Sequence, residues 1–236
     1  MTQQEIRDLH KIQSRNVRHL KRVFKNMTMD INFYLLKNDE FQIGIKTKLL
    51  ALIYSSISES QFVQILHTPN GFSYSEITQI QTERSIGDSW RLMLDIALNK
   101  VGDWNINADL SNRRNKIRQI ISDYIENPQE LRNKIAHGQW VHALNSKNTK
   151  ENENTTQRIQ NLNVVEISRW AEVHQYLCFI IRDLIQSPQK GFHNNYWINL
   201  TELEKYLNKS KNWTLEKRIE ILKKKKPAHN KSANTK

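Results

Sequence analysis

Residues 17–34 read VRHLKRVFKNMTMDINFY, and this stretch decides the fold class. Its apolar side chains recur at steps of three and four, which is the spacing of one face of an α-helix. They are Val17, Leu20, Phe24, Met27, Ile31 and Tyr34. Basic residues occupy the other faces. The stretch therefore predicts a long amphipathic helix.

The same spacing predicts further helices along the chain. We expect a second helix from about Ile45 to His67, stopped by TPNG at 68–71, and a third over 86–101, ended by GDW at 102–104. A fourth is expected over 110–125 and a fifth over 164–184. The face predicted to be buried in the second helix consists of Ile45, Leu49, Leu52, Ile53, Ser56, Ser60 and Val63.

The composition supports a fold made only of helices. The chain has 236 residues with only 6 Gly and 4 Pro, and few stretches alternate apolar and polar residues as a half-buried strand does. An all-β fold or a Rossmann-like fold is therefore not indicated. We predict an all-α helical bundle over 1–186. A basic C-terminal helical extension, partly flexible, is predicted over 187–236.

Two polar segments separate the predicted helices in the second half of the chain. Residues 145–157 (NSKNTKENENTTQ) have no apolar period and predict a loop. Residues 187–191 (SPQKG) predict a hinge between the bundle and the extension. Beyond the hinge, LTELEKYL and TLEKRIEILKKKK predict one or two short helices.

The net charge of +12 is concentrated at the two ends of the chain. Residues 1–25 carry seven Lys and Arg against two acidic residues, and residues 209–236 carry ten against two. The middle is nearly neutral, with 19 basic and 20 acidic residues. Such a distribution favours a polyanionic partner. The plainer interpretation is that both ends are simply solvated.

Cysteine content and hydropathy bear on the compartment. Cys178 is the single cysteine, so no disulfide forms within one chain. The start, MTQQEIRDLH, has no apolar core, and the run LLALIY at 49–54 is too short to span a bilayer. We expect a cytoplasmic protein without a membrane partner.

Residues 127–140 read NPQELRNKIAHGQW and hold the candidate chemistry. Asn127 is expected to cap a new helix, with Pro128 at its first position and Glu130 in a capping box. Leu131 and Ile135 share one helix face, which predicts that they point into the core. Three polar residues, Arg132, Asn133 and His137, remain on the other side.

A histidine and an arginine on one short helix suit the cleavage of RNA. A histidine such as His137 can take or give a proton at cellular pH, and an arginine such as Arg132 presents a fork of donors to phosphate oxygens. RNA carries its own nucleophile, the 2′-hydroxyl, beside the scissile phosphate. No carboxylate pair or metal-ligand spacing accompanies the motif, so we predict neither a metal nor a cofactor. One histidine does not serve as both base and acid, so a second copy of the chain is expected to complete the site.

The segment LRNKIAHG (131–138) resembles the motif of the HEPN superfamily. In that motif an Arg is followed four to six residues later by a His, often with a polar residue directly after the Arg. The resemblance would cover residues from about 10 to 186. It implies an all-α domain that dimerises to form a composite, metal-independent endoribonuclease site. It also implies that Arg132 stabilises the phosphate, that His137 is the general acid or base, and that Asn133 orients His137 or contacts the phosphate.

The resemblance further implies RNA products with a 2′,3′-cyclic phosphate and a 5′-hydroxyl, and a role as a toxin or in phage defence. A regulatory protein or antitoxin would be a partner. One departure weakens an antitoxin of the nucleotidyltransferase type, because Gln139 stands where toxins of that kind carry a Tyr. Further RNA-binding candidates are Lys134, Arg18, Lys21 and Arg22, with Glu59 as an orienting carboxylate. The alternatives are a catalytically silent module that binds RNA or protein, and a helical interaction protein in which the motif only forms salt bridges.

Overall fold

The structure, a computed structural model, describes residues 1–186, 188 and 197–224. Within these residues there is no strand, only an isolated antiparallel bridge between Leu144 and Glu151. The predicted all-α class is thus confirmed. The helices are α1 (Gln3–Lys37), α2 (Glu40–Leu66), α3 (Tyr74–Gln81), α4 (Ile86–Asn99), α5 (Ala108–Ile121), the π-helix η1 (Ser122–Glu126), α6 (Asn127–Ala136), α7 (Glu153–Asn161), α8 (Val164–Gln186), α9 (Trp197–Ser210) and α10 (Leu215–Lys224).

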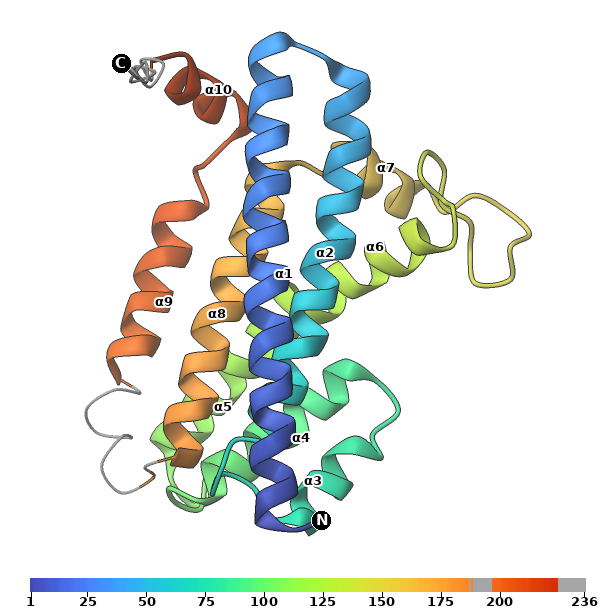
Figure 1. Ribbon diagram of the computed structural model, residues 1–236. Coiled ribbons are helices and arrows are strands. Elements are labelled where there is room, and N and C mark those ends of the chain that lie inside the picture. Colours follow the sequence, from blue (N-terminus) through green and yellow to red (C-terminus); the bar gives the residue numbers. More distant parts are fainter. Residues whose placement is uncertain (187, 189–196, 225–236) are drawn as a thin grey trace, which may run out of the picture.

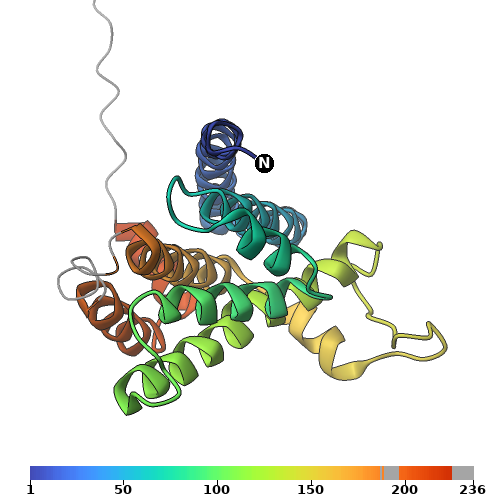
Figure 2. The ribbon, with the colours of Figure 1, turned by 90° about the horizontal axis from the view of Figure 1, so that it is seen from below.

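Four of the longer helices run along the molecule, and α6 crosses them. In Figure 1, α1 and α2 form a hairpin beside α8, with α9 along the outer side of α8. Helix α6 passes behind α2 and projects to one side together with α7. In the end view of Figure 2, α1 and α5 lie on opposite sides of the bundle. The predicted motif therefore lies on a helix that leaves the main bundle.

Helix α1 forms as its sequence predicts. Thr2 and Glu5 make a reciprocal capping box at its start, and Asn38 ends it in the left-handed region with φ 56°. Val17 and Ile31 of the predicted stripe are buried, and the other four residues of that stripe are partly buried. This helix supplies one wall of the bundle.

The predicted buried face of α2 is wrong. The buried side chains include Leu50, Ala51, Tyr54, Ile57 and Phe62, whereas the predicted residues are partly or fully exposed. The cause is that α2 is apolar on nearly every side, so the sequence period does not single out one face. By length and composition α2 is also able to cross a membrane, with a hydropathy of 1.2 over 18 residues, but 56% of that window is buried inside the bundle.

The core forms around α4, α5 and α8, which correspond to the helices predicted over 86–101, 110–125 and 164–184. Trp90 and Leu94 of α4, Ile117 of α5, and Leu177 and Ile181 of α8 are fully buried in one cluster. A second cluster joins α1, α2, α6 and the start of α8. Burial of such side chains is the main favourable contribution to the stability of the bundle.

The predicted restart of the helix at Asn127 is also wrong. Asn127 has helical dihedrals, φ −59° and ψ −45°, and the chain stays helical from Ala108 to Ala136 through the π turn η1. Pro128 has no N–H to offer to the carbonyl of Tyr124, and the Tyr54 hydroxyl donates to that carbonyl instead. Glu130 pairs with Arg158 at 2.9 Å rather than forming a capping box. The wider turn thus accommodates the proline without ending the helix.

Part of the predicted loop at 145–157 is helical. Asn152 caps α7 by accepting from the Thr155 N–H at 3.1 Å, and Thr155, Thr156 and Ile159 are buried. Three small or apolar residues in a polar stretch give too weak a period to be recognised. Helix α3, which begins with a capping box of Ser73 and Glu76, was likewise not predicted.

One or two short helices were predicted beyond residue 191, and the structure has two, α9 and α10. Leu200 and Leu203 of α9 are buried in the same cluster as α4 and α8, and Leu215 and Ile219 of α10 pack against the second cluster. The described part of the predicted extension is therefore packed on the bundle. The predicted hinge at 187–191, apart from residue 188, and the predicted flexible end at 225–236 lie outside the described residues.

His174 makes the stability of the bundle depend on pH. Burial beside Trp90 and Tyr54 lowers the pKa of His174 to about 3, from an ordinary value near 6.5. Only the unfolded chain binds this proton between those two values, so the contribution is complete above about pH 6.5 and is lost as the pH falls toward 3. We expect the free energy of unfolding to lose up to about 1.4 kcal/mol per pH unit across that window from this residue.

Urea unfolding of wild type and His174→Met at a series of pH values checks this prediction. The difference between the two curves isolates His174 from the carboxylates, which titrate in both proteins. Parallel curves from pH 6.5 to 3 would show that His174 is already protonated in the folded protein.

Candidate functional site

Helix α6 presents the candidate residues because its opposite side is anchored in the core. Leu131 and Ile135 are each 1% exposed and pack in the second cluster, as predicted. Residues one or two positions after each of them are turned by about 100° or 200° around the axis and so lie nearer the surface. Arg132 is partly buried, and Asn133 and His137 are exposed.

The segment after His137 ends α6 with a Schellman motif. The Gly138 N–H donates to the Ile135 carbonyl at 3.1 Å, and the Gln139 N–H donates to the Lys134 carbonyl at 3.0 Å. Gly138 has φ +80°, which L side chains rarely adopt. His137 therefore occupies the C-cap position, and its ring lies at the end of the helix rather than along its side.

Arg132 is held by residues of α2. Its Nε donates to the Ser55 hydroxyl at 3.0 Å, and its Nη2 donates to Glu59 Oε1. Gln129 adds a further link by donating to the same Glu59 oxygen at 3.1 Å. Glu59, the predicted orienting carboxylate, thus contacts Arg132 directly. The Nη1 group of Arg132 has no acceptor among the described residues, so two N–H donors remain for a ligand.

Asn133 and His137 face a different neighbourhood from the Arg132 guanidinium. They line an open hollow together with Glu130, Lys134, Gln139 and four loop residues, Leu144, Asn145, Ser146 and Asn148. No described residue forms a hydrogen bond with the side chain of Asn133 or His137. Lys134, a predicted RNA-binding residue, donates from Nζ to the Leu144 carbonyl at 2.6 Å, so its ammonium group fixes this loop.

The structure therefore brings together only part of the predicted set. Asn133, Lys134 and His137 share one hollow, and Arg132 and Glu59 form an ion pair on the side of α6 that faces α2. Because its Nη1 is free, the Arg132 guanidinium can still donate to a phosphate that lies between it and the hollow of His137. His142, a further histidine nearby, is paired with Glu151 at 2.8 Å.

Ser55 and Gln129 were not identified from the sequence. Ser55 lies one turn before Glu59 on α2, and Gln129 lies one turn before Arg132 on α6. The spacing of four or three residues from a predicted site residue was a usable signal. Which residues of α2 lie near Arg132 depends on the side of α2 that faces α6, and the sequence does not define that side.

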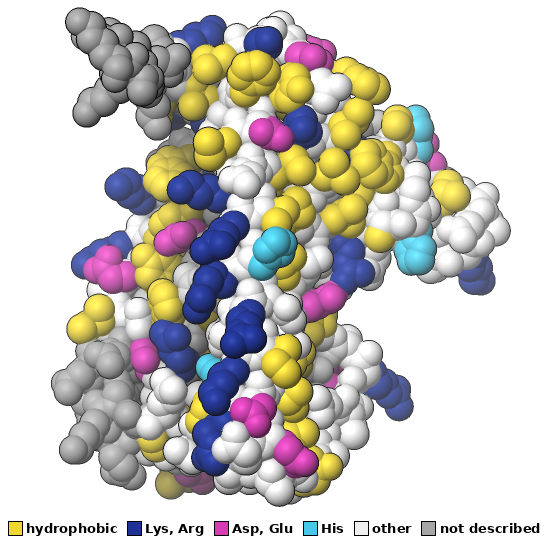
Figure 3. Space-filling view, viewed as in Figure 1, with side chains coloured by type: hydrophobic (Ala, Val, Ile, Leu, Met, Phe, Trp, Pro, Cys, Tyr) yellow, Lys and Arg dark blue, Asp and Glu magenta, His cyan; other side chains and the backbone are white. Residues whose placement is uncertain are grey.

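The other predicted RNA-binding residues lie on α1. Arg18 and Arg22 are exposed, as are Arg7, Lys11, Arg15 and Lys25, and these six recur at steps of three and four. We call them the α1 stripe, and Figure 3 shows dark blue side chains following α1 on this face. Lys21 differs, because it donates to Gln175 of α8 and burial lowers its pKa. The sequence from residue 9 to 29 contains no acidic residue that would neutralise the α1 stripe.

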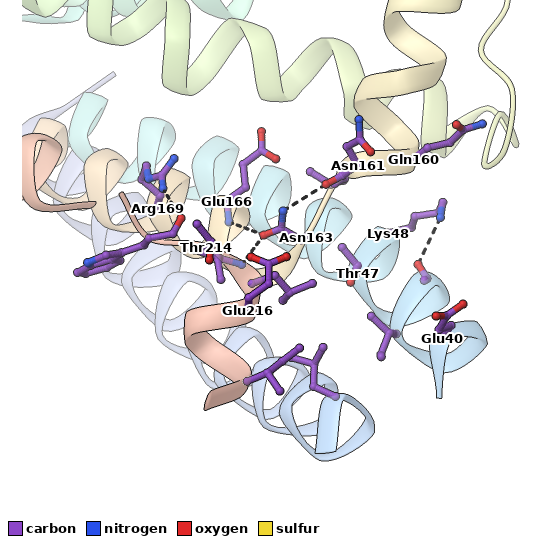
Figure 4. Close-up of a pocket in the computed structure, with 18 of the residues that line it drawn as sticks. Glu40, Thr47, Lys48, Gln160, Asn161, Asn163, Glu166, Arg169, Thr214 and Glu216 are labelled. Carbon is purple, nitrogen blue, oxygen red and sulfur yellow. Dashed lines mark hydrogen bonds between the residues drawn. The ribbon is translucent and has the colours of Figure 1, made fainter. Parts of the chain in front are cut away.

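A second hollow lies near the α1–α2 turn, between α2, α8 and α10, and is shown in Figure 4. Three carboxylates line it, namely Glu40, Glu166 and Glu216. Burial raises the pKa of Glu166, and Arg169 donates to the backbone carbonyl of Ser210 at 2.5 Å. This concentration of carboxylates disfavours a polyanion, so the hollow is not a candidate for binding RNA.

No cluster of three His, Cys, Asp or Glu side chains suitable for a metal ion occurs among residues 1–186, 188 and 197–224. Compared with known proteins, the chain matches no family model, no curated protein and no solved structure.

Replacing Gly138 should destabilise the motif without any steric clash. A Cβ at Gly138 would meet nothing within 4 Å, so Gly138→Ala costs only the backbone strain of a positive φ, about 1 kcal/mol. Gly44 is the matched control, since it lies inside α2 and its Cβ would meet only Lys48 Nζ, at 3.9 Å. Gly44→Ala should therefore stabilise the protein by about 0.5–1 kcal/mol. Chemical denaturation of both variants checks the two opposite signs, and a shift of the same sign in both would contradict the strain at Gly138.

Proposed function

We propose that this chain is a metal-independent endoribonuclease of the HEPN type, acting as a homodimer in phage defence or a toxin system. The observation that carries the proposal is the arrangement on α6. His137 and Asn133 are exposed at an open hollow, and Arg132 lies one turn away with its Nη1 group available. These groups match the needs of RNA transesterification, namely proton transfer and stabilisation of a phosphate.

In the proposed reaction the 2′-hydroxyl of RNA attacks the adjacent phosphorus while a histidine accepts its proton. The 5′-oxygen leaves as it receives a proton from a second histidine, and a 2′,3′-cyclic phosphate remains. His137 of each copy supplies one of these two functions. Arg132 stabilises the charge on the phosphate, and Ser55 and Glu59 keep its guanidinium in place. Asn133 donates to a phosphate oxygen or to the histidine ring.

A surface on α2 supports the proposed dimer. Phe41, Ile45, Leu49 and Ile53 form one ridge at steps of four, and Phe41 is 74% exposed. The other three are partly exposed, and none of the four packs against a core cluster. Ridges of this kind pack against each other between helices. The ridge lies beside the face of α2 that carries Ser55 and Glu59, so pairing of two ridges would bring two Arg132 residues near each other.

Charged residues on the ridge should separate the copies and abolish cleavage together. We expect Leu49→Asp with Ile53→Asp to convert a dimer to a monomer, since two unpaired carboxylates in an apolar interface are strongly unfavourable. Multi-angle light scattering measures the mass, and an RNA cleavage assay measures the activity. Ile12→Asp with Ile106→Asp is the matched control, because both isoleucines are more than half exposed elsewhere. A monomeric wild type that cleaves RNA would disprove the composite site.

Cleavage of RNA in the presence of EDTA tests the nuclease itself. We expect activity in the wild type that survives chelation and is lost in both Arg132→Ala and His137→Ala. The controls are Arg84→Ala, an exposed arginine outside the helices, and His142→Ala, whose ring is paired with Glu151. Products that end in a 3′-hydroxyl would exclude transesterification.

One observation favours a second candidate, a catalytically silent HEPN module that binds RNA or a protein. The Arg132 guanidinium is bound to Ser55 and Glu59 and does not share the hollow of His137. A silent module would bind RNA through the α1 stripe, with an affinity that falls steeply as salt rises, and cleave nothing.

A further inference from the structure

A small polar cavity lies between α1, α2 and α8, away from the candidate motif. Its volume is about 330 Å³, near the lower end of the range for small-molecule pockets. The polar side chains that line it are His10 of α1, Gln61 and Gln64 near the end of α2, Thr68 just after α2, and Gln175, Arg182, Asp183 and Gln186 of α8. Most of these side chains carry hydrogen-bonding groups, which is unusual for a space between packed helices.

Two of the lining side chains are deeply buried and lack partners. Thr68 is 1% exposed, and its hydroxyl has no hydrogen bond among the described residues. Gln61 is 4% exposed, and no described residue forms a hydrogen bond with its amide. Buried polar groups are nearly always paired, so both side chains offer hydrogen-bonding groups to water or to a polar ligand in the cavity. The amide of Gln175 also keeps its two N–H donors available, because Lys21 uses only its oxygen.

Cations lie directly beside this cavity. His10 and Lys21 occupy the edge of α1 next to the α1 stripe, and Lys21 contacts the cavity residue Gln175. Arg182 provides a planar guanidinium at the rim, 5.0 Å from the centre of the Phe179 ring. The cavity therefore opens where a chain of phosphates on the α1 stripe would pass.

We propose that this cavity binds one unstacked nucleobase of a single-stranded RNA whose phosphates lie on the α1 stripe. Amides and a hydroxyl offer donors and acceptors side by side, the pattern that the edge of a base requires. An arginine plane at the rim stacks on a base that has left its own stack. The small volume suits one flat heterocycle. The proposal rests on the RNA-binding part of the proposed function and adds a preference for one base.

The cavity and the candidate motif are separate sites. At about 100° per residue, Gln61 and Gln64 lie on the side of α2 opposite to Ser55 and Glu59, and Thr68 follows the end of that helix. Substitutions in the cavity thus leave the Arg132 ion pair untouched. Base preference and cleavage chemistry are therefore separable by mutation.

The test uses short strands of abasic spacer units, each carrying one 2′-O-methyl nucleotide with A, C, G or U, and one strand that is fully abasic. None has a free 2′-hydroxyl, so none is cleaved by transesterification. We expect fluorescence anisotropy to show that the full chain binds one of the four strands about tenfold more tightly than the abasic strand. Gln61→Leu with Thr68→Val should reduce that affinity to the abasic level.

Thr47→Val is the matched control, because Thr47 is also a buried threonine with an unpartnered hydroxyl but lines the other hollow. It should keep the preference. Gln175→Leu, at a partly exposed position, provides a second variant if the buried pair does not fold.

A preference that survives in the cavity variants, or equal binding of all five strands, overturns the base site alone. Failure of the wild type to bind any strand at low salt overturns RNA binding as well. A free nucleoside that competes as well as the preferred strand would assign the cavity to a free ligand and overturn the strand proposal.

Discussion

Replacing His137 by alanine should reduce EDTA-resistant RNA cleavage by about 10²–10⁴-fold, the usual contribution of a general acid or base. In a homodimer with two histidines at one phosphate, the variant loses both the proton acceptor and the proton donor. The remaining rate would come from Arg132 and from binding. Rates are measured with a defined oligonucleotide whose products are resolved by length and by end group.

The control for this prediction must separate chemistry from binding. His137→Ala should bind a 2′-O-methyl strand of the same sequence within about twofold of wild type, because the ring is exposed and holds no structural contact among the described residues. His142→Ala should cleave normally. A His137→Ala protein that cleaves at the wild-type rate would show that the motif on α6 has no role in proton transfer.

Trp90→Ala should destabilise the bundle by about 3–5 kcal/mol. Trp90 is fully buried in α4, with its ring centre 5.4 Å from both Phe62 and His174. Truncation would leave a cavity where α2, α4 and α8 meet. Since a domain of this kind has only about 5–15 kcal/mol of stability, such a loss approaches complete unfolding. Guanidinium unfolding at neutral pH measures it.

Trp90→Phe separates the effect of ring volume on stability from the effect of the buried indole N–H. The Trp90 Nε1 has no hydrogen-bond partner among the described residues, and an unpaired buried donor costs about 1–3 kcal/mol. Phenylalanine loses ring volume but removes this donor, so we expect a net loss below about 2 kcal/mol. Trp213→Ala, at a residue 42% exposed, should cost about 1 kcal/mol or less. Equal losses in Trp90→Ala and Trp90→Phe would mean that volume at this position is unimportant.

The spacing of apolar residues was sufficient to predict most of the helices, but not which helices pack against each other. The stripe of α1 and the buried faces of α4, α5 and α8 follow from steps of three and four, because each of these helices has a polar side. Helix α2 is apolar on nearly every side, so its apolar spacing does not single out a buried face. Three of the residues predicted for the core, Ile45, Leu49 and Ile53, instead belong to the outward ridge.

The composition of the candidate site was only partly predictable for a related reason. Arg132, Asn133 and His137 are close in sequence, so one motif identifies them. The contacts of Arg132 with Ser55 and Glu59 join residues 77 and 73 positions apart. Such contacts depend on the crossing of α2 and α6, and no local pattern encodes that crossing. The division of the motif between two sides of α6 therefore became visible only in the structure.

Because of the π turn η1, the number of residues between α5 and α6 determines which way the motif faces. Each residue of an α-helix advances the side chains by about 100°, and the wider turn at 122–126 holds one residue more than an α turn would. Deleting a single residue there would turn everything after it by that angle and carry Leu131 and Ile135 away from the core. Insertions and deletions of one residue in this segment thus change which residues of the motif face the solvent, even though every residue of the motif is retained. The spacing between α5 and the motif is as much a part of the site as the residues themselves.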